Sequence, residues 1–135
     1  MQFDDKIDYG PEGVVFNAKE VAIQNKYYRR AVWTGEYMQM TVMDIPPRGD
    51  VGLEKHEDTD QMLMIMQGVG TVYMGESEDK MERLGDATPN YVIMVPAGTY
   101  HNVVNNTSMH LKLISIYAPP HHKKGVIQKS KNDPE

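Results

Sequence analysis

The chain has 135 residues, of which 40% are apolar and 24% are charged, and it contains no cysteine. This composition fits one globular domain with a hydrophobic core, and it excludes disulfides, thiolate metal ligands and a cysteine nucleophile. The net charge is −5, so we expect no nucleic-acid partner. The apolar run Met62–Met66 is too short to cross a bilayer, and the polar N-terminus lacks a secretory signal. We therefore expect a cytoplasmic protein without a membrane partner.

The predicted elements are short strands separated by turns. Residues 1–30 read as an N-terminal arm with one or two short strands and one helical turn near 18–24. β-rich runs broken by Gly, Pro and Asn follow at 37–45, 61–67, 71–74, 91–95, 102–104 and 111–117. Strands of this length and spacing indicate a β-sandwich or barrel, which we place at 31–120. Residues 121–135 are polar and read as a C-terminal tail.

Two motifs resemble the signatures of the cupin superfamily. The second motif keeps Pro96, Gly98, His101 and Asn105, and Asn90 replaces its opening glycine. Asn tolerates a positive φ better than most residues, so this replacement is mild. The resemblance covers about residues 40–118. It implies an all-β double-stranded β-helix, the cupin jelly-roll barrel, with a metal ion inside.

The first motif departs from the family pattern at two of the usual ligand positions. Aligned on Gly68, it places His56 at the second family histidine, Glu54 at the first histidine and Gln61 at the glutamate. One carboxylate is therefore retained, at a different corner of the site. The resemblance implies metal ligands at Glu54, His56, Gln61 and His101.

The residues themselves support the same site. Glu54 and His56 are two positions apart, so on a strand they point to one face. With His101 they make a set of two imidazoles and one carboxylate, which suits one divalent ion such as Zn, Mn, Fe or Ni with open positions for substrate. Two alternatives stay open. Glu54 could be a catalytic general base, and Gln61 could hydrogen-bond a metal-bound water.

The remaining histidines are expected outside the ligand set. His110 has no motif position, and His121 and His122 could border the mouth of a pocket. The basic residues Arg48 and Arg83, together with Lys112, read as scattered surface charge.

Three methionines share one strand face. If Gln61 points into the barrel, then Met62, Met64 and Met66 point outward and form a large apolar surface. We favour a homodimer interface on this face, and packing under the N-terminal arm is the alternative. A copper site is disfavoured because no partner motif accompanies the thioethers.

The resemblance also suggests a reaction. Similar small cupins are labelled mannose-6-phosphate-isomerase-like, which implies a metal-dependent enzyme that interconverts an aldose and a ketose, with a sugar or sugar phosphate as substrate. In such an enzyme a carboxylate moves a proton, which conflicts with Glu54 also being a ligand. An Fe(II) dioxygenase of a small organic substrate is the second hypothesis. A non-catalytic cupin that binds a metal or a small molecule is the third.

Overall fold

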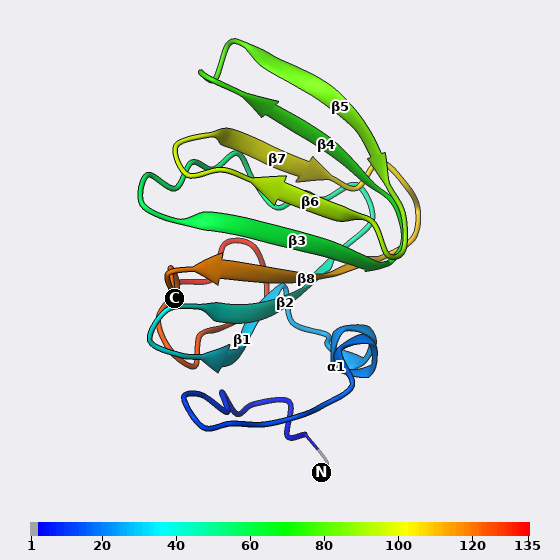
Figure 1. The fold of residues 1–135 in the computed structure, drawn as a ribbon. Helices are drawn as coiled ribbons and strands as arrows, with labels where there is room; N and C mark the ends of the chain where they lie inside the picture. Colours follow the sequence, from blue (N-terminus) through cyan, green and yellow to red (C-terminus); the bar gives the residue numbers. More distant parts are fainter. Residues whose placement is uncertain (1–2) are drawn as a thin grey trace.

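A computed structural model describes residues 3–135. Two antiparallel sheets face each other across the core (Figure 1). The larger sheet has the strand order β6-β3-β8-β2-β1-β9 and the smaller has the order β5-β4-β7. The elements are α1 (Ala18–Gln24), β1 (Arg29–Thr34), β2 (Gln39–Ile45), β3 (Asp60–Gln67), β4 (Gly70–Gly75), β5 (Met81–Ala87), β6 (Val92–Val95), β7 (Tyr100–Val104), β8 (Leu111–Ala118) and β9 (Ile127–Gln128). The predicted all-β double-stranded β-helix is confirmed.

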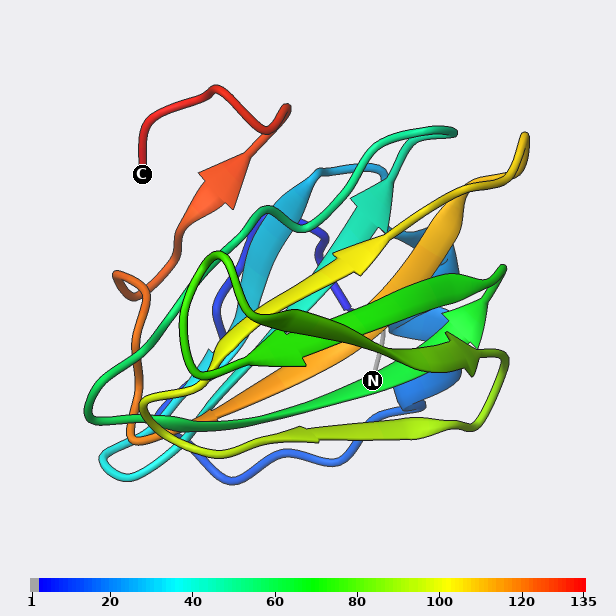
Figure 2. The ribbon, with the colours of Figure 1, turned by 90° about the horizontal axis from the view of Figure 1, so that it is seen from above.

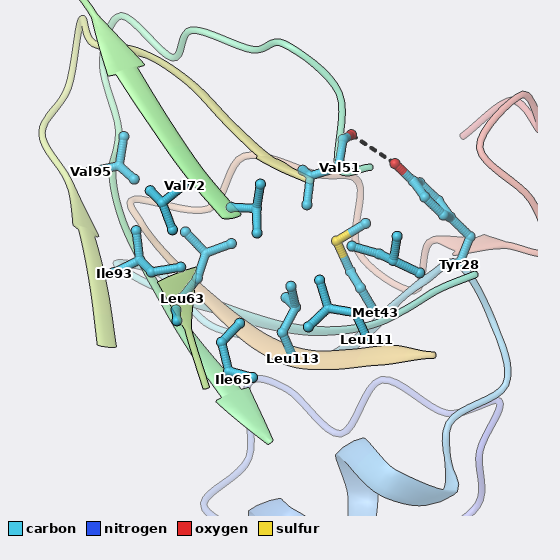
Figure 3. Close-up of a cluster of buried hydrophobic side chains, with 13 residues drawn as sticks. Tyr28, Met43, Val51, Leu63, Ile65, Val72, Ile93, Val95, Leu111 and Leu113 are labelled. Carbon is cyan, nitrogen blue, oxygen red and sulfur yellow. Dashed lines mark hydrogen bonds between the residues drawn. The ribbon is translucent and has the colours of Figure 1, made fainter. Parts of the chain in front are cut away.

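The core lies between the two sheets. β3 alternates buried and partly exposed residues, so Gln61, Leu63 and Ile65 point inward while the intervening methionines point outward. Leu113 pairs with Ile65 on one side and with Met43 on the other, and all three are fully buried (Figure 3). Burial of each large side chain of this kind stabilises the fold by about 1.5–3 kcal/mol.

The connection between β2 and β3 lies against β7 and extends the smaller sheet. The amide of Val51 donates to the carbonyl of Val103 at 2.9 Å, and Glu54 and His101 exchange two backbone hydrogen bonds of 3.0 and 2.9 Å. Viewed from above, this connection runs alongside β7 (Figure 2). Glu54 thus occupies an irregular, bridged segment instead of the regular strand suggested by its spacing from His56.

Glycine and asparagine turns shape the second motif. Gly98 has a φ of 80° and donates its amide to the carbonyl of His56 at 2.7 Å, which ties the two motifs together. Asn90, in place of the family's opening glycine, has a φ of 76°. Both residues adopt the left-handed region that glycine and asparagine tolerate best.

The N-terminal arm covers part of the outer face of the larger sheet (Figure 1). Asn17 caps α1 by accepting a hydrogen bond from the amide of Glu20 at 3.0 Å. Ala22 of α1 packs with outward residues of β2 and β8, and Met66 joins this cluster. Met62 instead lines a groove with Met94 and Ile116. The arm therefore covers one end of the methionine row and leaves the other end at the surface.

The C-terminal segment is built into the barrel. β9 pairs with β1, with Gln128 opposite Arg29, and both Gln128 and His122 are buried. The residues expected as a polar tail therefore contribute a strand and three buried side chains, those of His122, Val126 and Gln128. Among residues 3–135, no helix is long and apolar enough to cross a membrane.

Candidate metal centre

Inward residues become polar at one end of the barrel. Gln39, Tyr117 and Gln61 face one another across β2, β8 and β3, and the next inward row holds Thr41 and Ser115. All five residues are buried. The connection that carries Glu54 and His56, and β7 with His101, supply the remaining polar side chains on the opposite sheet.

Glu54, His56 and His121 form the closest group. Their potential ligand atoms all lie within 4.8 Å of one another. Oε2 of Glu54 is 3.4 Å from Nε2 of His56, and the ring centroids of His56 and His121 are 4.0 Å apart. His121 is exposed and Glu54 is partly exposed, so this side of the group is open to solvent. Two of the four predicted ligands therefore come together here.

His121 is the residue that sequence reasoning placed outside the set. It follows β8, whose Tyr117 pairs with Gln61. The residues just after β8 therefore emerge beside the site. The register between β3 and β8 determines where His121 lies, and neither sequence motif contains a position that would indicate it.

His101 lies next to the close group but is not part of it. Its ring centroid is 5.3 Å from that of His56. Nδ1 lies 3.0 Å from the carbonyl oxygen of Thr99. An N–H at Nδ1 donates to this carbonyl and leaves the lone pair on Nε2. That Nε2 is buried without a hydrogen-bond partner among the described residues, so it is available to bind a cation.

Gln61 presents an oxygen to the same space. Its Nε2 donates to Oγ of Ser115 at 2.8 Å, whereas its Oε1 is buried and lacks a partner in residues 3–135. A neutral oxygen in this position can bind a metal ion or accept a hydrogen bond from a metal-bound water.

Unpartnered polar atoms gather in this one region. In the part of the chain that the structure describes, five buried side-chain nitrogen or oxygen atoms have no hydrogen-bond partner, and every one belongs to this end of the barrel. Native proteins satisfy nearly all such atoms, so a cluster of exceptions needs an explanation. The atoms are Nε of Arg29, Oγ1 of Thr41, Nε2 of His56, Oε1 of Gln61 and Nε2 of His101.

Electrostatics keep the imidazoles in the form that binds metals. Burial, reinforced by the neighbouring His121 and His101, lowers the pKa of His56 to about 4. Burial also lowers the pKa of His101. Both rings are therefore neutral near pH 7 with a lone pair to donate. Burial raises the pKa of Glu54, although the Arg29 guanidinium, 3.5 Å from Oε1, opposes this shift.

The other two predicted non-ligands, His110 and His122, have polar partners of their own. His110 is exposed, and its Nδ1 is 2.7 Å from Asp44 at the far end of β2. His122 is buried beside His121, with Nε2 3.1 Å from the hydroxyl of Tyr117 and Nδ1 against Glu135. Both ring nitrogens of His122 therefore already have partners.

A two-sheet antiparallel barrel with histidines and a carboxylate at one end of its interior is the arrangement expected of a cupin domain. The chain belongs to this family, since the Cupin domain family matches residues 41–117.

Three relatives extend the comparison. The chain is 44% identical over 126 residues to the uncharacterized protein YrkC of Bacillus subtilis (strain 168), covering 93% of this chain and 68% of YrkC. It is 35% identical over 114 residues to the uncharacterized protein L612 of Acanthamoeba polyphaga mimivirus, covering 84% of this chain and 69% of L612. The crystal structure of BH2720 from Bacillus halodurans superposes with a TM-score of 0.86 at 41% identity, covering 91% of this chain and 93% of BH2720.

Proposed function

We propose that this chain is a metal-binding cupin in which Glu54, His56, His101 and His121 surround one divalent ion and Gln61 lies beside it. The convergence of unpartnered buried atoms from His56, His101 and Gln61 carries this proposal. The close group of Glu54, His56 and His121 supplies a carboxylate and the open side of the centre. With His121, the set has three imidazoles and one carboxylate, the composition that the resemblance to cupins implies, at exchanged positions.

We further propose that the centre is catalytic and takes a small polar substrate from the side of His121. When bound, a divalent ion polarises carbonyl and hydroxyl oxygens of such a substrate. In a sugar or sugar-phosphate isomerase, the three histidines would hold the ion, and Glu54 would move the proton between neighbouring carbons. The position of His121 supports this division of roles, because it supplies a third imidazole and frees Glu54 from ligation.

A dioxygenase is the second candidate, because the close group itself contains two histidines and one carboxylate. This is the donor set of non-haem Fe(II) oxygenases. In that function Glu54 is a ligand and not a base. The two candidates therefore differ in what Glu54 does.

Metal content tests the centre itself. The purified protein is loaded with Mn(II), Fe(II), Ni(II) or Zn(II), desalted and analysed for metal per chain. We expect about one ion per chain in the wild type, and a loss of at least about tenfold in affinity for His56→Ala, His101→Ala and His121→Asn. His110→Ala, which removes an exposed histidine paired with Asp44, is the matched control. Equal metal content in all four variants and the wild type would contradict the site.

Glu54→Gln then separates the two reactions. An isomerase with Glu54 as base should retain its metal and lose turnover of aldoses measured without oxygen. A dioxygenase with Glu54 as ligand should lose Fe(II), and its wild type should consume dioxygen after anaerobic loading. A protein purified with a bound small molecule but no metal would instead indicate a non-catalytic binder.

A further inference from the structure

Arg29 is a buried arginine with unused hydrogen-bonding capacity. It opens β1, and only 5% of its surface is exposed. Its Nη1 donates to Oε1 of Gln128 at 2.6 Å, and its Nη2 lies 3.5 Å from Oε1 of Glu54. Its Nε is buried without a partner among residues 3–135. A guanidinium has five N–H donors, and the one on Nε is unused here.

The adjacent arginine shows what a purely structural arginine looks like in this fold. Arg30 is also buried in β1. Its Nη1 donates to the carbonyl of Ile7 at 2.8 Å, and its Nη2 donates to the carbonyl of Asp4 at 3.2 Å. Arg30 thus binds the N-terminal arm with both ends of its guanidinium. Arg29 instead faces the candidate metal centre, with its Nε unpartnered among the described residues and its Nη2 held by the 3.5 Å ion pair with Glu54.

Arg29 is also held in place before any ligand arrives. Its guanidinium lies 5.3 Å from the centre of the Tyr28 ring, and the hydroxyl of Tyr28 donates to the carbonyl of Val51 at 2.7 Å (Figure 3). Gln128 fixes the opposite end of the fork through Nη1. A charged group fixed in this way binds a partner with little further loss of side-chain freedom.

The charge of the loaded centre calls for an anion. A divalent ion and Arg29 bring three positive charges, and Glu54 supplies one negative charge. Three further groups act on Glu54: His121, which would be neutral as a metal ligand, and the charged side chains of Glu135 and Lys131. The side chains of Glu135 and Lys131 are 42% and 50% exposed and of opposite sign, so these two charges offset each other. Uncompensated positive charge in a buried site is costly unless a ligand of opposite sign neutralises it.

We infer that the ligand of this centre is a small anion whose carboxylate or phosphate oxygens bind the Nε and Nη2 side of Arg29 while the rest of the molecule reaches the metal. The inference rests on the proposed function and names its substrate class. An arginine fork suits this task because its parallel N–H groups match the spacing of paired anionic oxygens. A neutral sugar would leave both the fork and the positive charge unsatisfied.

Binding of defined probes to the metal-loaded protein tests the inference. Titration calorimetry compares acetate with its uncharged isostere acetamide, and malonate with inorganic phosphate. We expect acetate to bind and acetamide not to bind, and the stronger of malonate and phosphate to identify the anionic group. Arg29→Gln and Arg29→Lys should retain the metal and lose at least about tenfold in affinity for that anion. Arg30→Gln is the matched control and should bind the anion like the wild type.

Three results would overturn the inference. Acetamide could bind as tightly as acetate, the Arg29 variants could keep wild-type anion affinity, or they could lose the metal. The last result would show that Arg29 only positions Glu54.

A measurement on the wild-type protein distinguishes anion binding by Arg29 from metal binding by the site. If the Arg29 variants do not fold, the ¹⁵N-labelled Nε signal of Arg29 is followed during titration with the same anion, with and without metal. A shift in the metal-free protein supports anion recognition even if the metal proposal fails. An Nε signal that does not change in either the metal-free or the metal-loaded protein would reject anion recognition by Arg29.

Discussion

Gln61 occupies the position at which the family pattern has its glutamate, and the carboxylate of this site lies at Glu54 instead. Glu54 is bridged to His101 and therefore lies on the sheet opposite Gln61. Gln61 fits the altered site because its Nε2 donates to Ser115 and its buried Oε1 is left without a partner among the described residues. A second carboxylate at this buried position would add a negative charge near Glu54, and without metal the guanidinium of Arg29, which already lies 3.5 Å from Oε1 of Glu54, would face two carboxylates.

Gln61→Glu should therefore have opposite effects in the two states of the protein. Without metal, we expect it to lower the free energy of unfolding by about 1–3 kcal/mol, because an additional polar group is left unsatisfied. With metal, we expect the variant to gain more stability than the wild type does. Urea denaturation in the presence of a chelator and of excess Mn(II) measures both effects. Gln67→Glu, near the partly exposed end of the same strand, is the control, and equal effects at the two positions would contradict this account.

At the scale of elements, β6 is the edge of the larger sheet and carries exposed apolar residues. Val92 and Met94 point outward, and Met94 is 63% exposed. With Met62 and Ile116, Met94 lines a groove of about 360 Å³ on the face that the N-terminal arm leaves uncovered. Exposed apolar groups at an open sheet edge favour association. We therefore propose that the homodimer expected from the methionine row forms at β3 and β6.

Met94→Glu should convert this homodimer into monomers. A buried glutamate in each copy would lose its hydration and face a second negative charge across a two-fold interface. Size-exclusion chromatography with light scattering gives the mass directly. Met109→Glu is the matched control, because Met109 is also 63% exposed but lies in the loop before β8. A wild type that is monomeric at 100 μM would rule out this interface, as would a Met94→Glu variant that remains dimeric.

At the scale of the whole molecule, the sequence predicts those features that depend on residues close together in the chain. The turn at Gly98, the left-handed Asn90 and the helix at 18–24 follow from residue types, and the structure has all three. The pairing of the two motifs was also predictable, because the resemblance to cupins implies that they meet.

The remaining parts of the site depend on pairings between distant residues. Arg29 enters the site region because β1 is paired with β9 and its side chain binds Gln128, 99 positions further along the chain. His121 enters it because β8 ends beside the start of β3. Local patterns do not specify register between strands so far apart, since many registers keep the same alternation of apolar and polar residues. The sequence therefore places His121 no closer than the mouth of a pocket and gives Arg29 no role in the site.

The ion pair between Asp50 and Lys131 connects the C-terminal segment to the connection that carries Glu54. Asp50 also accepts a hydrogen bond from Nδ2 of Asn102 at 3.0 Å. Burial acts to raise the pKa of Asp50, but the hydrogen bonds from Lys131 and Asn102 outweigh burial and hold that pKa below its ordinary value. The charged form of Asp50 is therefore stabilised by folding, and protonation of Asp50 works against the folded state.

Asp50→Asn should for this reason destabilise the protein only where Asp50 is charged. The unfolded pKa of Asp is about 3.9, so the contribution is complete above about pH 5 and is lost as the pH falls through the lower pKa of the folded state. We expect the variant to lose about 0.5–1 kcal/mol at pH 7, the range of partly exposed ion pairs, and less at pH 3. Denaturant titrations of the metal-free protein at both pH values measure the difference, with the exposed Asp58→Asn as control. An equal loss at pH 7 and pH 3 would show that Asp50 acts through its shape and not through its charge.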